Sequence, residues 1–303
     1  MECVVTKLRE KINNENIVPL GCIKIHLESS SNTLTVGANS TGVIGKIITP
    51  NVTFTNSVFS GLTEQEFPNG SYRTASVSGE CDIILSKTTS ITRLELGGGG
   101  GVAFGKANID ALYGNSAMTM LTIQRASGNI KSLSSMASLL SVFMVSDGIG
   151  IYGDIANFPI STSLYSLIIN GAINVSGDLS FVSGLSKLVD INIYGASITG
   201  DISAFSSLAN LRDIDLGRTL VSGSISVFAG KSSLRNLQLI GCDITGNLGQ
   251  LVNVPALKDA TFPSTVYYTS DDAARIDAIM ASNGGTQKPN GHYFYGGTEV
   301  DSY

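Results

Sequence analysis

The chain has 303 residues, a formal net charge of −5 at pH 7, and 14% charged against 43% hydrophobic residues. Disordered chains combine few apolar residues with many charges, so this composition excludes that class. Nucleic-acid-binding proteins present basic surfaces, so we expect no nucleic acid as a partner. No apolar run reaches the ~18 residues of a membrane-spanning helix, and the opening MECVVTKLRE does not resemble a signal peptide. We therefore expect neither membrane insertion nor export by that route.

The first 88 residues carry short β-rich runs between turns of Gly, Asn and Ser. Apolar and polar residues alternate strictly over residues 23–28, which is typical of a half-buried strand. The expected strands cover residues 23–28, 34–36, 43–48, 52–55, 72–77 and 82–85. We predict a small all-β domain over residues 1–88, whose last strand is shared with the segment that follows. It is larger than an end cap needs to be, and attachment to a larger assembly would explain the excess.

A glycine-rich segment comes next, and residues 100–107 nearly match the phosphate-binding loop GxxxxGK[ST]. Ala107 stands where that loop needs a hydroxyl for Mg²⁺, and neither a long helix nor a parallel α/β pattern follows Lys106. We interpret the segment as an irregular loop between repeats, and we expect no cofactor.

The strongest signal is a repeat of 23 residues in the middle of the chain. Leu188, Leu211 and Leu234 each begin a fragment of the form L-x-x-[LI]-x-[LI], and a glycine follows 12 residues after each leucine. Those glycines are Gly200, Gly223 and Gly246. Related fragments begin at Ile91, Met118, Leu140, Leu164 and Leu257. Together they predict seven or eight rungs.

Each part of this pattern has a physical cause. The last two apolar residues of a fragment lie two apart, so they share one face of a β-strand. One rung cannot bury them alone, whereas stacked rungs bury them in a continuous core. The Gly-Asp or Gly-Ser step suits a turn, because glycine tolerates positive φ and Asp accepts local amide hydrogen bonds. A recurrent column is expected to fill the back of the coils: Phe158, Phe181, Phe205 and Phe228, then Leu251.

Residues from about 91 to 262 resemble a leucine-rich-repeat solenoid, and the I-x-G-x-I step is similar to the plant-type variant. The position that the family usually gives to Asn or Cys holds small residues here: Ala172, Ala196, Thr219 and Cys242. Cys242 is therefore interpreted as a space-filling residue of its rung. We predict a mainly β fold, in which a leucine-rich-repeat solenoid with a parallel β-sheet occupies residues 89–262. It follows the all-β domain of residues 1–88 and precedes a C-terminal α/β cap over residues 263–303.

The C-terminal segment carries the signals of a helix, which we interpret as the cap on the exposed end of the solenoid. Ser270 is a good N-cap, acidic residues fill the first turn, and Gly284 follows the end. The apolar face of this helix consists of Ala273, Ile276, Ile279 and Met280. Residues 292–295 then predict a last strand.

Cysteine and histidine give little support for a metal or catalytic site. Four cysteines are scattered along the chain: Cys3, Cys22, Cys81 and Cys242. They form no short pair, which a zinc site or a dense disulfide framework would show, so we expect isolated buried thiols in a reducing compartment. The two histidines, His26 and His292, lie far apart in sequence, and we expect no metal site.

Polar residues dominate the outward positions of the predicted strands. The candidate binding residues on this concave face are Asp190, Asn192, Tyr194, Asp213, Asp215, Asn236, Gln238 and Asp259. Neighbouring strands lie ~4.8 Å apart, so Asp190 and Asp213 are expected to be neighbours, and like charges at that spacing are unfavourable unless screened. One interpretation is a patch for a cation, a partner bearing Lys or Arg, or a sugar. The other is a solvated polar face, which any soluble solenoid needs.

A catalytic interpretation of the same carboxylates is disfavoured. Paired carboxylates hydrolyse glycosides when one of them stays protonated. An open, shallow face desolvates a carboxyl group too little to raise its pKa that far. We therefore expect no enzyme activity and no catalytic residue.

We interpret the chain as a non-enzymatic structural or binding protein, because solenoids offer extended recognition surfaces. Its plan of a β-domain followed by short plant-like repeats is similar to repeat proteins carried by bacteriophages of gut bacteria and by their prophages. That resemblance implies a virion component (a capsid decoration, head fibre or tail-associated protein) with other virion proteins as partners. The alternative is a secreted or cell-surface bacterial adhesion module that binds a surface protein or a host glycan. Association of several copies is left open, although no heptad stretch long enough for a coiled coil is present.

Overall fold

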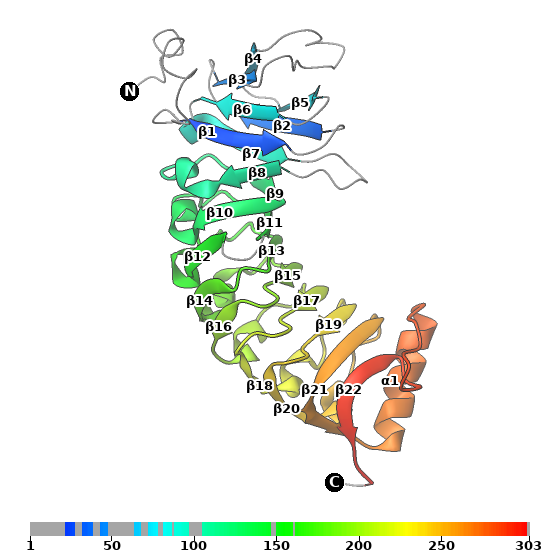
Figure 1. Cartoon of the computed structure of the whole chain (residues 1–303). Helices are drawn as coiled ribbons and strands as arrows, with labels where there is room; N and C mark the ends of the chain where they lie inside the picture. The colour runs from blue at the N-terminus through cyan, green and yellow to red at the C-terminus, as the bar shows by residue number, and fades with distance from the viewer. Residues whose placement is uncertain are drawn as a thin grey trace. The chain divides into compact units, whose positions relative to one another are not determined.

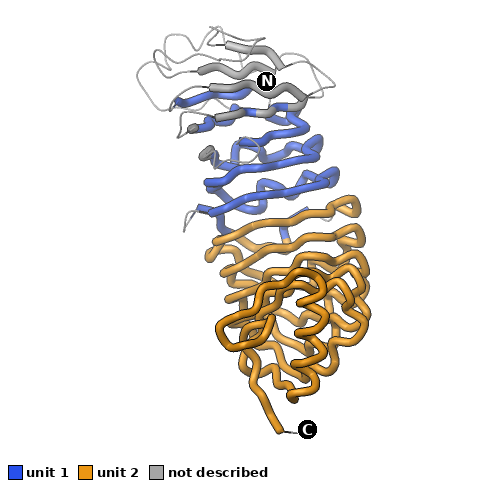
Figure 2. The backbone as a smooth tube through the Cα atoms, turned by 90° about the vertical axis from the view of Figure 1, so that its right-hand side faces the viewer, with its two compact units in different colours: residues 1–152, 157–159 blue, residues 153–156, 160–303 orange. Residues whose placement is uncertain are grey.

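The structure is a computed structural model, and it describes residues 22–27, 32–38, 43–47, 64–67, 72–77, 81–86, 88–96, 105–146, 150–159 and 161–301. The chain folds into two compact units: unit 1 is residues 1–152 with 157–159, and unit 2 is residues 153–156 with 160–303 (Figure 2). The expected strand over residues 52–55 and the start of the phosphate-loop-like segment lie outside the described residues. Within the described ranges, no helix has both the length and the apolar character needed to cross a bilayer.

Unit 1 begins with antiparallel strands. They are β1 (Ile23–Leu27), β2 (Asn32–Ala38), β3 (Val43–Ile47), β4 (Glu64–Phe67), β5 (Tyr72–Val77) and β6 (Cys81–Leu85). One sheet has the order β4-β3-β6-β1, and β5 pairs with β2 in the other. β1 and β2 pair antiparallel with the first strands of the coils, β8 (Gly105–Asn108) and β7 (Ile91–Leu96). The expected last strand over residues 82–85 corresponds to β6 and lies in the same sheet as β8, but β1 stands between β6 and β8, so β1 makes the direct contact with the coils.

The coils of unit 1 carry two rows of parallel strands (Figure 1). The first row is β7, β9 (Met120–Ile123) and β11 (Ser141–Val145), and the second is β8, β10 (Arg125–Asn129) and the first half of β12 (Ile151–Asp154). Leu121 pairs with Leu94 on one side and Val142 on the other, and all three are buried. This register buries Leu139 and leaves Leu140 exposed, so the predicted rung start at Leu140 is wrong by one residue.

Unit 2 has the same architecture. Its first row of parallel strands is β13 (Ser166–Asn170), β15 (Asp190–Asn192), β17 (Asp213–Asp215), β19 (Asn236–Gln238) and β21 (Asp259–Tyr268). The second row is β14 (Asn174–Asp178), β16 (Ser197–Thr199), β18 (Ser222–Ser224) and β20 (Asp243–Asn247). The mainly β leucine-rich-repeat solenoid with a parallel sheet, as the sequence predicts, is confirmed.

Short 3₁₀ helices form the back of the coils. They span Thr88–Ser90, Ile109–Leu112, Ile130–Leu133, Ile155–Asn157, Leu179–Gly184, Ile202–Phe205, Ile225–Phe228 and Leu248–Gln250. The predicted column behind the sheet is confirmed at Phe158, Phe205, Phe228 and Leu251, which are all buried. The prediction for Phe181 is wrong: it is half-exposed, and Val182 is buried instead. Val182 stands three residues after the first residue of its 3₁₀ helix, as Phe205 and Phe228 do in theirs, so the inward position is the same and the predicted column was misaligned by one residue at Phe181.

A helix and a last strand close the C-terminal end of unit 2. α1 spans Ser270–Ser282, and β22 (Phe294–Glu299), which starts two residues later than predicted, pairs parallel with β21. The predicted apolar face is buried at Ala273, Ile276 and Met280. The N-cap is Thr269 and not the predicted Ser270. Thr269 Oγ1 accepts a hydrogen bond from the Asp272 N–H (3.3 Å), while the Asp272 carboxylate accepts one from the Thr269 N–H (3.1 Å).

The described cysteines are of two kinds. Cys22 is disulfide-bonded, so the expectation of isolated thiols throughout the chain is wrong at this position. Cys81 and Cys242 are free and buried. Burial, with a smaller contribution from the charge of Asp82, raises the pKa of Cys81 to about 11. Cys242 fills space between rungs as predicted, and its thiol donates to the Leu216 carbonyl at 3.0 Å.

A ladder of polar side chains stabilises the turns that lead into the 3₁₀ helices. In successive coils one side chain accepts a hydrogen bond from the N–H two residues further on: Asn108, Asn129, Asp154, Asp178, Asp201, Ser224 and Asn247. In unit 2 the following coil places a glycine against that side chain. Gly200 has φ +101°, and a Cβ there would lie 2.6 Å from Asp178 Oδ2. Both the conformation and the space therefore require glycine.

Gly200→Ala is expected to lower the free energy of unfolding by about 2 kcal/mol or more, because it adds an unfavourable φ and a steric overlap with Asp178. Gly195→Ala is the matched control: its φ is +75°, but nothing lies within 4 Å of a Cβ there. The control is expected to lose only about 1 kcal/mol, from conformation alone. Urea unfolding measures both values, and equal losses would contradict the steric role of the ladder.

Candidate functional site

The predicted polar residues lie together on the outward face of the first row of strands in unit 2. The strands pair in register, so one row consists of Asp190, Asp213, Asn236 and Asp259. A second row consists of Asn192, Asp215, Gln238 and Thr261. Tyr194 follows β15, two residues beyond Asn192. Within each row, polar groups repeat at the ~4.8 Å spacing between strands.

Arg212 links the acids of the first row. Its Nε donates to Asp213 Oδ2 at 2.7 Å, and its Nη2 donates to Asp190 Oδ1 at 3.1 Å. The side-chain amide of Asn236 also donates to Asp213. The repulsion expected between Asp190 and Asp213 is therefore offset by a basic side chain of the same protein.

The two linked carboxyl groups differ in the direction of their pKa shifts. Burial raises the pKa of Asp190, a hydrogen bond shared with Asp213 and the charge of Asp213 add to this rise, and Arg212 opposes it only in part. Burial also acts to raise the pKa of Asp213, but hydrogen bonds from Arg212 and Asn236 outweigh it and hold that pKa below its ordinary value. Asp190 is therefore the carboxyl group that is harder to ionise.

In the second row, Asp215 and Asn192 are hydrogen-bonded within the protein. Asp215 Oδ2 accepts a hydrogen bond from the Asn192 amide at 3.3 Å, and Oδ1 accepts one from the Gly217 N–H at 3.0 Å. Burial raises the pKa of Asp215, and the hydrogen bond from Gly217 opposes this only in part. Asn192 Oδ1 accepts from the Tyr194 N–H at 3.1 Å. Asn192 and Asp215 therefore bind one another, whereas the buried Thr261 hydroxyl has no hydrogen-bond partner among the described residues.

Asp259, at the end of the first row, contacts the C-terminal cap. Lys288 Nζ lies 2.7 Å from Asp259 Oδ1, and the Gln238 amide donates to Oδ2 at 3.4 Å. The contact between Lys288 and Asp259 is an ion pair that lacks the geometry of a hydrogen bond. The buried Oδ1 of Asp259 accordingly has no hydrogen-bond partner in the described part of the chain. The repeat pattern does not predict Lys288, since this residue lies outside the repeats.

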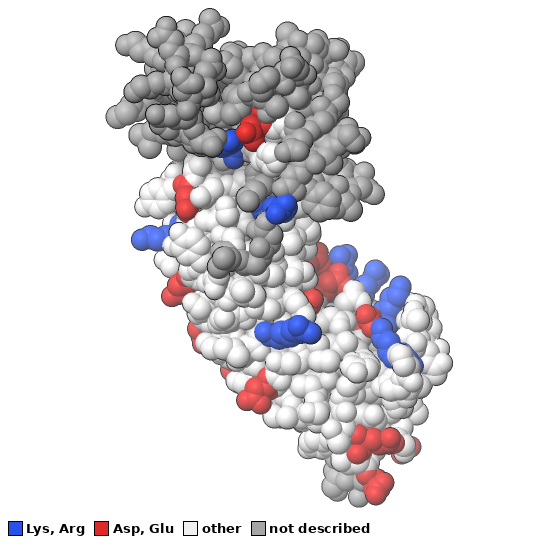
Figure 3. Space-filling model, viewed as in Figure 1, with Lys and Arg blue, Asp and Glu red and all other residues white. Residues whose placement is uncertain are grey.

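A column of basic residues runs beside the first row, and the outward polar pattern does not include it. Arg212, Arg235 and Lys258 occupy the second position of three successive rungs. With Lys288 they line a pocket of about 420 Å³, whose other lining residues are Asp213, Asn236, Asp259, Gly285 and Thr286. Figure 3 shows basic and acidic side chains gathered on this face, beside α1. The sequence does contain a signal for this basic column, because a basic residue immediately precedes the outward polar residue in each of these rungs.

The pocket has an excess of positive charge. Its two carboxylates, Asp213 and Asp259, are already paired with Arg212 and Lys288. Arg235 and Lys258 are exposed and have no acidic partner within the described ranges. An unpaired guanidinium and an unpaired ammonium group beside one pocket favour an anionic ligand.

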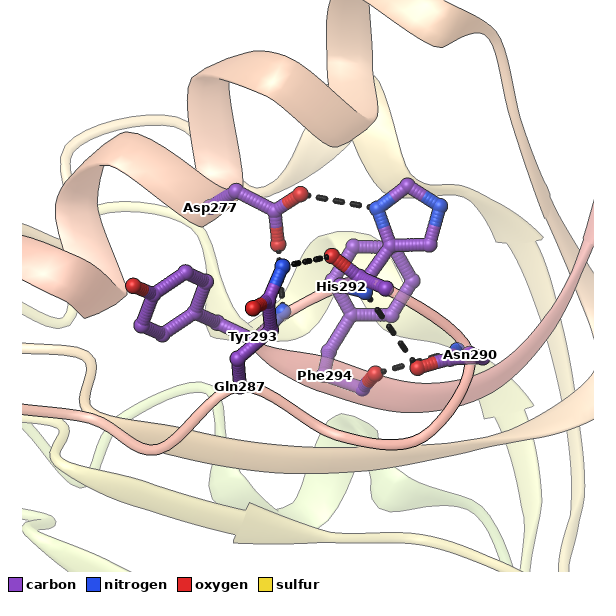
Figure 4. Close-up of polar contacts among 7 residues, drawn as sticks. Asp277, Gln287, Asn290, His292, Tyr293 and Phe294 are labelled. Atoms are coloured by element: carbon purple, nitrogen blue, oxygen red, sulfur yellow. Dashed lines mark hydrogen bonds and ion pairs between the residues drawn. The ribbon is translucent and has the colours of Figure 1, made fainter.

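A cluster of polar contacts holds the loop that carries Lys288 (Figure 4). Asp277 on α1 has its Oδ2 2.7 Å from His292 Nδ1, and its Oδ1 accepts from the Tyr293 N–H at 2.6 Å. The His292 ring stacks on Phe294, with ring centroids 4.8 Å apart. The helix α1 therefore positions the loop that completes the pocket.

His26 and Lys106 belong to unit 1 and not to this site. His26 Nδ1 is 2.8 Å from Asp82 Oδ1, and Lys24 Nζ is 3.0 Å from Oδ2. Burial acts to raise the pKa of Asp82, but the hydrogen bonds and charges of Lys24 and His26 outweigh it and lower that pKa. Lys106 lies on β8, and the short 3₁₀ helix Ile109–Leu112 follows in place of the long helix that a phosphate-binding loop needs.

No family model and no curated protein matches the chain. Among solved structures, the plant peptide hormone receptor RGFR1 in complex with RGF2 is 16% identical over 56% of this chain and 32% of that chain, with a TM-score of 0.45. The functional domain of InlJ from Listeria monocytogenes is 16% identical over 53% of this chain and 33% of that chain, with a TM-score of 0.36. The internalin inlF from the same organism is 14% identical over 64% of this chain and 72% of that chain, with a TM-score of 0.30. The chain thus spans about a third of the length of the first two.

The opposite pKa shifts of Asp190 and Asp213 predict opposite effects of removing their charges. Asp190→Asn is expected to raise the free energy of unfolding at pH 7 by a few tenths of a kcal/mol, because a raised pKa means that the folded state disfavours the ionised group. Asp213→Asn is expected to lower it by a similar amount, because Arg212 and Asn236 stabilise that carboxylate.

Both changes in the free energy of unfolding are expected at pH values above the pKa values of Asp190 and Asp213. They are expected to vanish as the pH falls below those pKa values, because the wild-type carboxyl groups are then protonated in the folded and in the unfolded state. Urea unfolding at neutral pH and in acid measures them. Changes of the same sign at pH 7 would contradict the division of roles between these two residues.

Proposed function

We propose that the first row of strands in unit 2, with its C-terminal cap, binds an acidic segment of a protein partner. The observation that carries this proposal is the pocket in which Arg235 and Lys258 are exposed without acidic partners while Asp213 and Asp259 are paired internally. An open solenoid face suits an extended peptide segment better than an enclosed small molecule. The sequence pattern left open a patch for a cation, a basic partner or a sugar, or a solvated polar face, and the exposed basic side chains support an acidic ligand instead.

In this proposal the chain is a non-enzymatic binding protein. A glycosidase needs two carboxyl groups that flank the scissile bond, one of which donates a proton. Here Arg212 contacts both Asp190 and Asp213, and of the two only Asp213 lines the pocket. The carboxyl groups are thus held by Arg212, and recognition explains the arrangement better than hydrolysis.

Selection of peptides from a displayed library of random dodecapeptides tests the proposal. The wild-type protein is expected to enrich sequences rich in Asp and Glu, with binding that weakens as salt is added, because opposite charges meet on an exposed surface. Arg235→Glu is expected to weaken the binding of the selected peptides about tenfold or more, since it puts a like charge at the pocket. Fluorescence anisotropy measures the dissociation constants.

Lys131→Glu is the matched control, because it makes a comparable change of charge at an exposed residue that does not line the pocket. This variant is expected to bind the selected peptides as the wild type does. Enrichment of basic or neutral sequences by the wild type, or no enrichment, would overturn the proposal. Binding of a neutral oligosaccharide without any peptide would favour the sugar-binding alternative.

The location of this surface is a separate proposal. The sequence resemblance implies presentation on a bacteriophage virion. The disulfide bond of Cys22 favours the alternative, a secreted or cell-surface adhesion module, because such bonds persist in oxidising environments. We therefore expect mass spectrometry to find the chain at the surface or in the medium of phage-free bacterial cultures. Its detection only in purified phage particles would establish the virion component instead.

A further inference from the structure

One residue of unit 2 differs from the glycines that occupy the equivalent position in the neighbouring rungs. Gly171, Gly195 and Gly241 stand seven residues after the leucine that opens each rung, with φ of +72°, +75° and +79°. The equivalent residue of the rung that Leu211 opens is Arg218, with φ +59°. This left-handed conformation is unfavourable for an L-residue with a Cβ, because the Cβ crowds the carbonyl oxygen that follows. Glycine suits the backbone better, so the reason for arginine lies in its side chain.

The neighbouring residues accommodate that side chain against Tyr194. The Arg218 guanidinium carbon lies 5.7 Å from the centroid of the Tyr194 ring, which is within the range of a cation–π contact. Gly217 lies against the same ring, since a Cβ there would be 3.0 Å from Tyr194 Cδ2. A Cβ on Gly241, in the next rung, would be 3.4 Å from Arg218 Cγ. Glycines on two rungs therefore make room for the Tyr–Arg pair.

The guanidinium of Arg218 is exposed, and it has no acidic partner within the described residues. The nearest acid in sequence, Asp215, has its two oxygens bonded to Asn192 and to the Gly217 N–H. A stacked guanidinium uses its face for the ring and keeps its in-plane N–H donors for other contacts. Those donors match the two oxygens of a carboxylate.

We propose that Arg218, supported by Tyr194, binds a carboxylate of the partner segment at a second contact point. This inference rests on the proposed function, because it concerns the same acidic segment. The pocket lies beside Arg212, just before β17, and Arg218 lies three residues after β17 ends. Six fully extended residues span at most roughly 20 Å, and the turn that closes from the Leu216 carbonyl to the Thr219 N–H shortens the distance from Arg212 to Arg218, so a segment of about six residues or fewer laid along the strand reaches both points. The spacing of its carboxylates then determines which segments bind.

Arg218→Gly is the decisive variant, because it restores the residue that the backbone favours. The affinity for peptides selected on the wild type is expected to fall about tenfold, while the midpoint of thermal unfolding does not fall. Arg218→Lys keeps the charge and the backbone conformation but loses the planar fork, and a similar loss of affinity is expected. A purely structural role for the Tyr–Arg contact predicts the reverse: a lower midpoint in Arg218→Gly with unchanged affinity.

Arg235→Glu separates this inference from the proposed function. If the selected acidic peptides lose affinity for Arg235→Glu but bind Arg218→Gly as tightly as the wild type, the second contact point is refuted and the proposed function stands. If the wild type selects no acidic peptides, both are refuted. Weaker binding by Arg218→Gly, with its thermal midpoint retained, supports the inference.

Discussion

In-register pairing of parallel strands is the constraint on which the rest of unit 2 depends. Ile191, Ile214 and Leu237 pair along one column across β15, β17 and β19, and all are buried. Burial of such a side chain contributes ~1.5–3 kcal/mol, and a slip of one residue would turn the column to solvent. The same register determines the outward rows, because successive residues of a strand face opposite ways. The register of the strands therefore determines which side chains form the core and which polar side chains form the candidate site.

This coupling explains which parts of the fold the sequence could predict. Columns that recur every 23 residues are visible because each rung solves the same packing problem, and they include Leu188, Leu211 and Leu234. The errors fall where two adjacent apolar residues compete for one inward position. Leu139 and Leu140 both fit the motif, and only the register with the neighbouring coil decides between them. Phe181 and Val182 are both apolar, but Val182 follows Gly177 at the same spacing as Phe205 follows Gly200, and Val182 is the buried residue.

The candidate site shows a second limit of prediction from the sequence. Its acidic residues were predictable, because outward positions of a strand alternate with inward ones. Their partners were harder to predict, since Arg212 reaches an acid on the preceding strand and Lys288 comes from a loop that α1 holds in place. Once those contacts are counted, the two acids that line the pocket are paired with Arg212 and Lys288, and the unpaired charge at the pocket is basic. The sign of a surface therefore depends on which charges the protein pairs internally, and composition alone does not reveal that.

A repeat protein also supplies its own comparisons, because equivalent positions of other rungs show what the fold requires there. Lys231 departs from an apolar column, but it is buried, burial lowers its pKa, and its ammonium donates to the carbonyls of Phe205 and Leu208 at 2.8 and 2.9 Å. The Lys231 ammonium group finds its hydrogen-bond acceptors within the protein, so a stabilising role explains why lysine stands at this position. Arg218 departs from a glycine column at a cost in backbone conformation, yet its donors point to no acid of the described chain. The same comparison that assigns a structural role to Lys231 supports the binding role that we propose for Arg218, whose one described side-chain contact is with the Tyr194 ring.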